Sequence, residues 1–201
     1  MVEACLWDWV GTLRKKTKQL DKIVHDAIYS TLSQRGNISY EKARSIIDSK
    51  IGRNTYTQIF IDLGLQKEDL WDALRTADTP RYVKMDPKLT TMFNDLSDYR
   101  HTIVTSLPRD ILNAEIEKIG IPSETFDYTV CSNDVSKNKP HPEPFLKAVK
   151  LLKVKQKNCV MIGDRHAIDI VTANKLGMET IEIGKDVRTV YDVPRYLRRF
   201  K

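Results

Sequence analysis

Short apolar runs alternate with helical patterns over most of this 201-residue chain, and this alternation constrains the fold more than any other feature. Runs rich in Val, Ile and Thr, each followed by Gly, Pro, Asn or Asp, predict buried strands at residues 3–8, 101–106, 127–131 and 158–162. A further strand is predicted at 179–183. Strands that alternate with helices indicate an α/β fold, a Rossmann-like doubly wound parallel sheet with helices on both faces.

Apolar residues at helical spacing fill the intervals between the later strands. The three stripes are Ile111, Leu112, Ile116 and Ile119; Phe145, Leu146, Val149 and Leu152; and Ile170, Val171, Ala173 and Leu176. Each stripe predicts a helix that packs one face on the sheet. Gly177 is expected to end the last helix, because glycine readily adopts the left-handed conformation of a helix C-terminus.

Residues 15–85 break this rhythm, because four helical patterns follow one another there without a strand signal. These patterns centre on Leu20–Ile28, Ala43–Ile47, Tyr56–Leu63 and Leu70–Leu74, and Ser39 is the expected N-cap of the second. The sequence therefore predicts a core formed by residues 1–14 and 86–201. It predicts that residues 15–85 form an α-helical cap domain inserted directly after the first strand.

Composition narrows the class of protein. Hydrophobic residues make up 41% of the chain and charged residues 30%, which is typical of a soluble globular protein. Residues 1–6 are too short for a secretory signal, and no apolar run approaches the roughly 20 residues of a membrane span, so no membrane association is expected. The three cysteines lie in apolar, strand-like contexts and predict buried free thiols in a reducing, cytoplasmic environment.

The net charge of +6 and the pI of about 9.1 raise the question of a nucleic-acid partner. Basic residues cluster at 14–18, 147–157 and 195–201, but acids are interleaved elsewhere and no nucleic-acid motif accompanies them. We therefore expect a solvated basic surface and no nucleic-acid partner. A positive field would still favour anionic substrates entering a cleft.

Polar residues stand where the predicted strands end. Asp8 ends the first strand, Thr105 and Ser106 end the second, Lys139 lies on the loop after the third, and Asp164 ends the fourth. Taken alone, each of these residues has an ordinary structural explanation, such as a cap of a turn or a solvated side chain. Because ligands bind beyond the carboxyl ends of strands in open parallel sheets, the four positions together predict a site.

These segments together resemble the haloacid dehalogenase superfamily, most of whose members are phosphatases. The resemblance covers nearly the whole chain and rests on an ordered set of motifs. These are residues 7–13 (WDWVGTL), 103–106 (IVTS), 139–143 (KPHPE) and 160–164 (VMIGD) with Asp169, followed by 173–178 (ANKLGM). The inserted helices correspond to the cap that the family places between its first and second motifs.

The resemblance implies that Asp8 is the nucleophile, which forms an aspartyl-phosphate with a phosphoryl substrate. It also implies Mg²⁺, held by Asp8, Asp164 and the backbone carbonyl of Val10, since Mg²⁺ favours oxygen ligands. Asp169 is expected to orient a metal-bound water or Lys139. The metal cancels the repulsion between a carboxylate and an anionic phosphate.

Further residues are implied on the substrate side. Thr105 and Lys139 would hold the equatorial oxygens of a small phosphorylated substrate, one by a hydrogen bond and one by charge. Backbone N–H groups near Trp9 and Ser106 are candidate additional donors, and the side chain of Trp9 is a candidate for the entrance of the site. Arg53 lies in a predicted break between two cap helices, where it could meet a distal anion or simply be a surface arginine.

Val10 departs from the phosphatase pattern, which has a second aspartate two residues after the nucleophile. That aspartate protonates the leaving oxygen, a role worth roughly 10²–10⁴-fold. Three alternatives follow. In the first, the chain is still a Mg²⁺-dependent phosphatase, helped by good leaving groups or by a residue such as His141 or His166. In the second, it is a dehalogenase-type or phosphonatase-type hydrolase. In the third, it binds a phosphorylated ligand with weak or no turnover.

The remaining sequence features favour the first alternative. Asp164 and Asp169 form an acidic corner that a metal-free dehalogenase would not need. A phosphonatase would need a Schiff-base lysine just after Gly52, whereas Lys50 precedes this glycine. The sequence thus favours a phosphatase with a modified acid–base step.

Overall fold

The computed structural model describes residues 1–51 and 54–200, which form two compact units. The sheet unit comprises Met1–Lys15 and Lys84–Lys201, and the helical unit comprises Lys16–Val83. The chain therefore leaves the sheet unit once and returns to it once. Each unit is described by itself.

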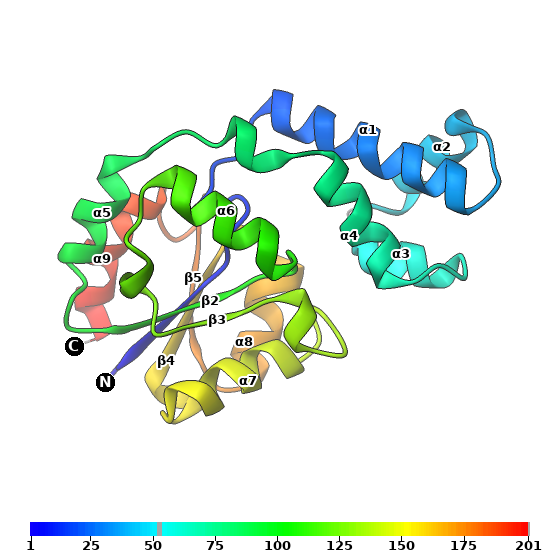
Figure 1. The fold of residues 1–201 in the computed structure, drawn as a ribbon. Coiled ribbons are helices and arrows are strands. Elements are labelled where there is room, and N and C mark those ends of the chain that lie inside the picture. Colours follow the sequence, from blue (N-terminus) through cyan, green and yellow to red (C-terminus); the bar gives the residue numbers. More distant parts are fainter. Residues whose placement is uncertain (52–53, 201) are drawn as a thin grey trace. The chain divides into compact units, whose positions relative to one another are not determined.

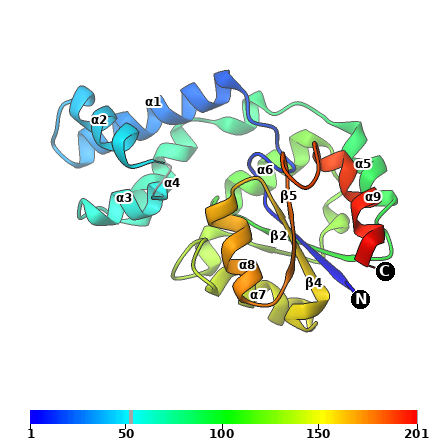
Figure 2. The ribbon, with the colours of Figure 1, turned by 180° about the vertical axis from the view of Figure 1, so that it is seen from behind.

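Within residues 1–51 and 54–200, five parallel strands form one sheet. Figures 1 and 2 show the arrangement of this sheet from two sides. They are β1 (Ala4–Trp7), β2 (Arg100–Val104), β3 (Tyr128–Val130), β4 (Cys159–Gly163) and β5 (Glu179–Glu182), in the spatial order β3-β2-β1-β4-β5. Every strand begins and ends within two residues of its predicted bounds. The predicted parallel α/β fold is confirmed, and β1 lies at its centre.

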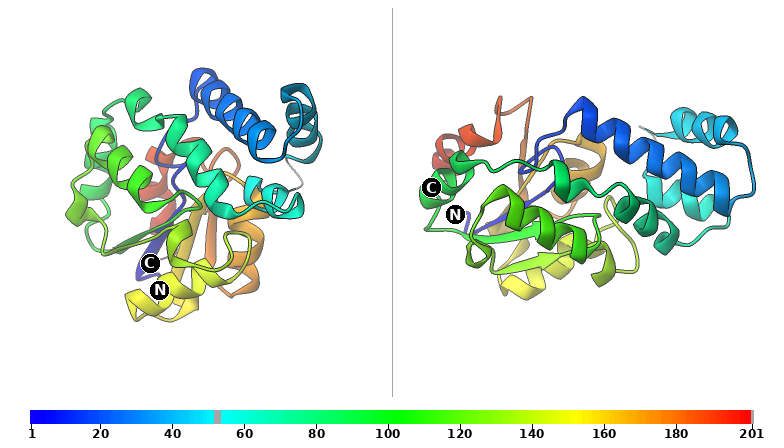
Figure 3. Two further views of the ribbon diagram at one scale, coloured as in Figure 1. Left: turned by 45° about the vertical axis from the view of Figure 1, so that its right-hand side comes forward. Right: turned by 45° about the horizontal axis from the view of Figure 1, so that its top comes forward.

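Helices cover both faces of this sheet (Figure 3). The bounds are α5 (Pro87–Asn94), α6 (Arg109–Ile119), α7 (Glu143–Leu152), α8 (Val171–Lys175) and α9 (Val193–Leu197). Alternation along β1 decides which residue meets which face. Leu6 belongs to a buried cluster with Phe145 of α7 and Ala173 of α8, whereas the Trp7 ring lies 5.3 Å from that of Phe93 on α5.

The helix predicted from the stripe at Ile170–Leu176 is divided in two. A π-helical turn spans His166–Ile170, and α8 follows as a five-residue α-helix. The turn carries Asp169, which is fully buried, and the backbone N–H of Asp169 bonds to the carbonyl of Arg165 (2.8 Å). π turns are frequently found at functional sites, and this one carries a buried carboxylate that apolar periodicity does not reveal.

The helical unit contains α1 (Lys18–Arg35), α2 (Tyr40–Lys50), α3 (Tyr56–Asp62) and α4 (Lys67–Thr76). Thr17, Ser39 and Thr55 cap the first three helices, since each hydroxyl accepts from a backbone N–H three residues on (3.2 Å). The predicted cap at Ser39 is confirmed. The core of this unit is apolar and includes Ile28, Leu32, Ala43, Ile47, Ile59, Phe60 and Leu70.

Two further properties concern the chain as a whole. No helix in the described residues is both long and apolar enough to span a bilayer. Cys5, Cys131 and Cys159 are buried free thiols, as predicted. Burial raises the pKa of Cys131 and of Cys159 to about 11 and also raises the pKa of Cys5. All three thiols are therefore protonated and poorly reactive near neutral pH.

A buried histidine makes the stability of the sheet unit depend on pH. His101 is 5% exposed, accepts from Trp7 Nε1 at Nδ1 (3.2 Å) and has Nε2 3.1 Å from the carbonyl of Leu96. Burial lowers the pKa of His101 to about 4, although the Leu96 carbonyl and Asp127 favour the charged form. In the unfolded chain its pKa is about 6.5, so the unfolded state binds more protons between pH 6.5 and 4.

We expect neutral His101 to make its full contribution to the free energy of unfolding above pH 6.5. This contribution should be lost as the pH falls towards 4, by roughly 3 kcal/mol in total. Urea unfolding between pH 7.5 and 4.5 measures it. His101→Gln, which cannot take up the proton, should flatten the pH dependence of unfolding free energy in this window, whereas His141→Gln controls for the substitution at an exposed site. An unchanged slope in His101→Gln would contradict the assignment.

Candidate active site

The carboxyl ends of the parallel strands carry the predicted site residues. Asp8 directly follows β1 and Thr105 follows β2, and these two strands are neighbours. Asp164 follows β4 on the other side of β1, and the Asp8 N–H bonds to the carbonyl of Ile162 on β4 (2.9 Å). Asp8 thus stands at the centre of the sheet edge, with a polar position on either side.

Lys139 joins two of the acids across a large separation in sequence. It lies on the loop between β3 and α7, and its side chain is only 1% exposed. Its Nζ donates to Asp8 Oδ1 (2.6 Å) and to Asp169 Oδ1 (2.7 Å). One buried ammonium therefore holds two carboxylates in fixed positions.

Charge governs the protonation of this cluster. Burial by itself would lower the pKa of Lys139, but the charges of Asp169 and Asp8 outweigh burial and raise that pKa above its ordinary value. Burial and the charge of Asp8 raise the pKa of Asp169, and Lys139 opposes the rise. We infer that the lysine is held as an ammonium ion by carboxylates that repel one another.

A third carboxylate completes the cluster, which we call the acid cluster: Asp8, Asp164 and Asp169. One oxygen from each lies within 4.8 Å of the others. The three acids and the ammonium of Lys139 together carry a formal charge of −2, which the charge of Arg165 near Asp169 offsets in part. Hard oxygen donors with excess negative charge suit a divalent cation such as Mg²⁺, so the residues present fit the ion that the resemblance implies.

Two glycines allow the loops to approach the acid cluster closely. Gly11 has φ +96°, and a Cβ built there would lie 2.2 Å from Asp164 Oδ2. A Cβ on Gly163 would lie 2.5 Å from Cβ of Asp169. A side chain at either position would displace an acid of the cluster, which explains the glycine in the first motif and the glycine before Asp164.

Val10 and Thr12 lie on the loop that follows Asp8. Thr12 Oγ1 donates to Asp8 Oδ2 (3.2 Å), so each oxygen of the Asp8 carboxylate has its own donor. Thr12 was not predicted as a site residue, although it is part of the first motif. Val10 is half-buried and brings only its backbone carbonyl as a polar acceptor. Its role as a metal ligand stays a prediction.

Thr105 and Ser106 follow β2, next to β1. Thr105 is buried, its N–H bonds to the carbonyl of Val130 (2.9 Å), and its hydroxyl accepts from the N–H of Leu107 (3.2 Å). These bonds fix the turn after β2. Ser106 is half-buried. Contact of either residue with a substrate oxygen stays a prediction.

The side chain of Trp9 does not line an entrance. It is fully buried, and its Nε1 donates to Glu115 Oε2 on α6 (2.5 Å). For Trp9, therefore, the backbone N–H remains a candidate donor to the substrate, and the side chain does not. Glu115 was not predicted, but a signal existed: an acid stands within the apolar stripe Ile111, Leu112, Ile116 and Ile119.

Three other candidates have different outcomes. Arg53 lies outside the described residues. His166 is exposed, and its Nδ1 lies 2.8 Å from Glu182 Oε2. His141 is exposed as well, and its Nδ1 accepts from the N–H of Glu143 (3.2 Å). Glu143 and Glu182, the partners of the two histidines, lie outside the acid cluster, so a role as the missing acid stays a hypothesis for both.

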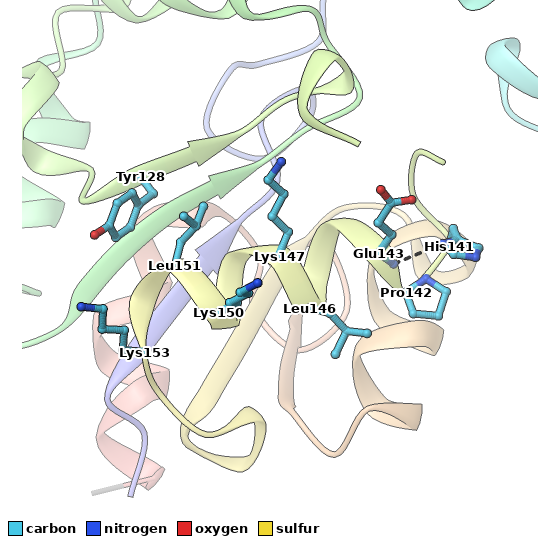
Figure 4. A pocket seen from close by; sticks show the side chains of 9 residues that line it. All are labelled: Tyr128, His141, Pro142, Glu143, Leu146, Lys147, Lys150, Leu151 and Lys153. Atoms are coloured by element: carbon cyan, nitrogen blue, oxygen red, sulfur yellow. Dashed lines mark hydrogen bonds between the residues drawn. The ribbon is translucent and has the colours of Figure 1, made fainter. Parts of the chain in front are cut away.

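A groove in the sheet unit lies along α7, apart from the acid cluster. Figure 4 shows Tyr128, Leu146, Lys150 and Leu151 around it, and its volume is about 720 Å³. No residue of the acid cluster lines it.

Several solved structures with a similar fold are named as phosphatases or as other enzymes. A HAD phosphatase from Thermococcus onnurineus is 25% identical, with 98% of each chain covered and a TM-score of 0.70. A β-phosphoglucomutase from Clostridium difficile has a TM-score of 0.73 at 18% identity, with 99% of this chain and 96% of that chain covered. At such identity the second likeness shows the fold alone.

Sequence relatives match a shorter region. The pyrophosphatase PpaX of Bacillus mycoides is 36% identical over 86 residues, which is 43% of this chain and 39% of that protein. The match thus spans about two fifths of the length of the curated relatives. A family model described as haloacid dehalogenase-like hydrolase matches residues 6–183, which hold every member of the acid cluster and Lys139. The chain belongs to the haloacid dehalogenase-like hydrolase family.

Proposed function

We propose that this hydrolase is a Mg²⁺-dependent phosphatase that acts on a small phosphorylated metabolite through an aspartyl-phosphate on Asp8. One observation carries the proposal. The buried ammonium of Lys139 lies 2.6 Å from Asp8 and 2.7 Å from Asp169, beside a third acid. A carboxylate nucleophile, a fixed cation and spare oxygen donors are the parts that phosphoryl transfer requires.

Each residue has a separate role in the first step, the transfer of the phosphoryl group to Asp8. Asp8 attacks phosphorus through one carboxylate oxygen, and the bond from phosphorus to the leaving oxygen breaks with its electron pair. Lys139 offsets the charge of the incoming phosphoryl group, and Thr12 orients the carboxylate from the other side. Thr105 and the N–H groups of Trp9 and Ser106 are the proposed donors to the equatorial oxygens.

The second step hydrolyses the aspartyl-phosphate. Water attacks phosphorus, the bond to Asp8 breaks, and the carboxylate and inorganic phosphate are released. When bound by Asp8, Asp164 and the Val10 carbonyl, Mg²⁺ would supply charge neutralisation of the transferred group. Asp169 orients Lys139, to which it is hydrogen-bonded.

The helical unit is the proposed cap, with the boundaries 15–85 predicted from sequence. A helical lid can exclude water and select substrates, and Arg53 is its proposed contact for a distal anion. The pyrophosphatase name of the matched Bacillus relatives supports phosphorus–oxygen chemistry. Three buried free thiols support a cytoplasmic setting.

Val10 favours a second candidate function, the binding of a phosphorylated ligand with little turnover. Without a proton donor at this position, an alkoxide would leave unprotonated. The metal-type acid cluster argues against the third candidate, dehalogenation, since halide leaves without a metal or a proton. The two phosphate-based candidates differ in rate and share one site.

Metal removal tests the proposal directly. We expect hydrolysis of p-nitrophenyl phosphate and of some members of a phosphorylated-metabolite panel with Mg²⁺, and loss of at least about 100-fold after treatment with EDTA, reversed by added Mg²⁺. Released phosphate is the readout. Binding of the same esters without phosphate release would favour the second candidate. Chloride release from 2-chloropropionate in EDTA would overturn the proposal in favour of dehalogenation.

A further inference from the structure

The loop that follows Asp8 is closed at its base by backbone hydrogen bonds. The carbonyl of Trp9 accepts from the N–H of Arg14 (2.8 Å) and, less closely, from the N–H of Thr12 (3.3 Å). The N–H of Gly11 donates to the carbonyl of Arg14 (2.7 Å). Residues 9–14 are therefore a compact loop whose two ends are Trp9 and Arg14.

Both ends of this loop reach the same buried carboxylate. Glu115 Oε2 on α6 lies 2.5 Å from Trp9 Nε1 and 3.0 Å from Arg14 Nε. Glu115 and Trp9 are fully buried, and Arg14 is 5% exposed. The Trp9 indole donates a hydrogen bond to Glu115, whereas the Arg14 contact is an ion pair in which Nε is not aligned for a hydrogen bond. Because removing one partner of a buried ion pair leaves the other charge uncompensated, Glu115 ties both ends of the loop to α6.

The loop carries parts that the acid cluster uses. Thr12 donates to Asp8 Oδ2, and Gly11 lies against Asp164, where no side chain fits. Val10, between the loop ends, brings the carbonyl proposed as a metal ligand. A shift of Trp9 or Arg14 would therefore displace donors and ligands on the opposite side of the loop.

We propose that Glu115 is a positioning residue of the active site. From α6 it fixes Trp9 and Arg14, and through them it keeps the loop in register with Asp8 and Asp164 for metal and phosphoryl binding. Glu115 contacts neither substrate nor reacting atoms. The inference deepens the proposed function and rests on it for its catalytic consequence.

The first test is Glu115→Gln, which keeps the side-chain shape and removes the charge. We expect kcat to fall roughly 10- to 100-fold with a smaller change in KM, because a small misplacement of catalytic groups has effects of that size. Mg²⁺ affinity, measured by calorimetry, should fall as well. Hydrogen exchange at the amides of Gly11 and Arg14 should become faster, and this readout needs neither metal nor substrate.

A double variant separates positioning from stability. Replacing a buried ion pair by apolar side chains is often neutral or stabilising, whereas removing one partner is destabilising. The double variant Arg14→Met with Glu115→Met should therefore be more thermally stable than Glu115→Gln. Its Mg²⁺ affinity should stay low, and hydrogen exchange in the loop should stay fast. Recovery of all three together would mean a purely structural role and would overturn the inference.

Ile119→Val is the matched control on the same helix, since it removes one buried methylene from α6. It should lower stability and leave Mg²⁺ affinity and loop exchange near the wild-type values. If Glu115→Gln behaves like Ile119→Val in these measurements, the inference is wrong. If the wild-type protein hydrolyses no phosphate ester, the proposed function fails, and loop exchange still decides whether Glu115 fixes the loop.

Discussion

Asp8→Asn is expected to lower phosphate release by about 10⁴-fold or more, the scale on which removing a catalytic nucleophile acts. The amide is a poor nucleophile, and it removes one of the two carboxylates that accept from Lys139 Nζ, while Asp169 still accepts from it. Steady-state kinetics with p-nitrophenyl phosphate measures the loss. Rapid acid quenching with radiolabelled substrate should find a phosphoenzyme in the wild-type protein and none in the variant.

Asp127→Asn is the matched control for this change. Asp127 also pairs with a basic side chain, Arg100 (2.9 Å), but it precedes β3 and so lies at the opposite ends of the strands. This variant should retain activity, and circular dichroism should show that both variants are folded. Unchanged phosphate release by Asp8→Asn would remove Asp8 as the nucleophile and with it the proposed mechanism.

Val10→Asp is expected to raise turnover by roughly 10²-fold or more for substrates with poor leaving groups, the contribution of a general acid–base group. The loop position already follows the nucleophile by two residues, so the new carboxyl would stand where the phosphatase pattern has its acid. For p-nitrophenyl phosphate, whose leaving group needs little protonation, the gain should be small. Comparing kcat for alkyl and aryl phosphates measures the difference.

Val10→Asn is the control, since asparagine resembles aspartate in shape and polarity but cannot act as a proton donor in place of a carboxyl group near neutral pH. It should leave the preference for aryl over alkyl phosphates unchanged. No gain with Val10→Asp for alkyl phosphates would mean that another group of the chain already donates the proton, or that the leaving group needs none. Equal gains in both variants would attribute the effect to polarity.

The strands and most of the helices could be predicted because their signals are local. Apolar runs of five or six residues identified four of the strands, a further strand was predicted at 179–183, and the stripe at Phe145–Leu152 identified α7. The short helices α5 and α9 were missed. Helix α5 starts at Pro87, which is compatible with a first helical turn, and its buried residues Leu89, Met92 and Phe93 have helical spacing, but the pattern spans barely more than one turn.

The site was predicted in part. Asp8, Lys139 and the two later acids could be proposed from their places at strand ends and from the family resemblance, and the structure brings their side chains together. Trp9 was assigned a candidate place at the entrance and is buried instead. Its partner Glu115 lies on an apolar stripe, where periodicity predicts core packing and does not predict a charged side chain.

The sequence by itself determined the order of strands and helices and therefore which residues reach the carboxyl edge of the sheet, because short-range periodicity encodes the type of element and the face that it buries. Only the tertiary structure decided the pairing of Lys139 with Asp8, 131 residues apart, and of Trp9 with Glu115, 106 residues apart. Such contacts depend on how distant elements pack, with distances of a few ångströms that no local pattern fixes.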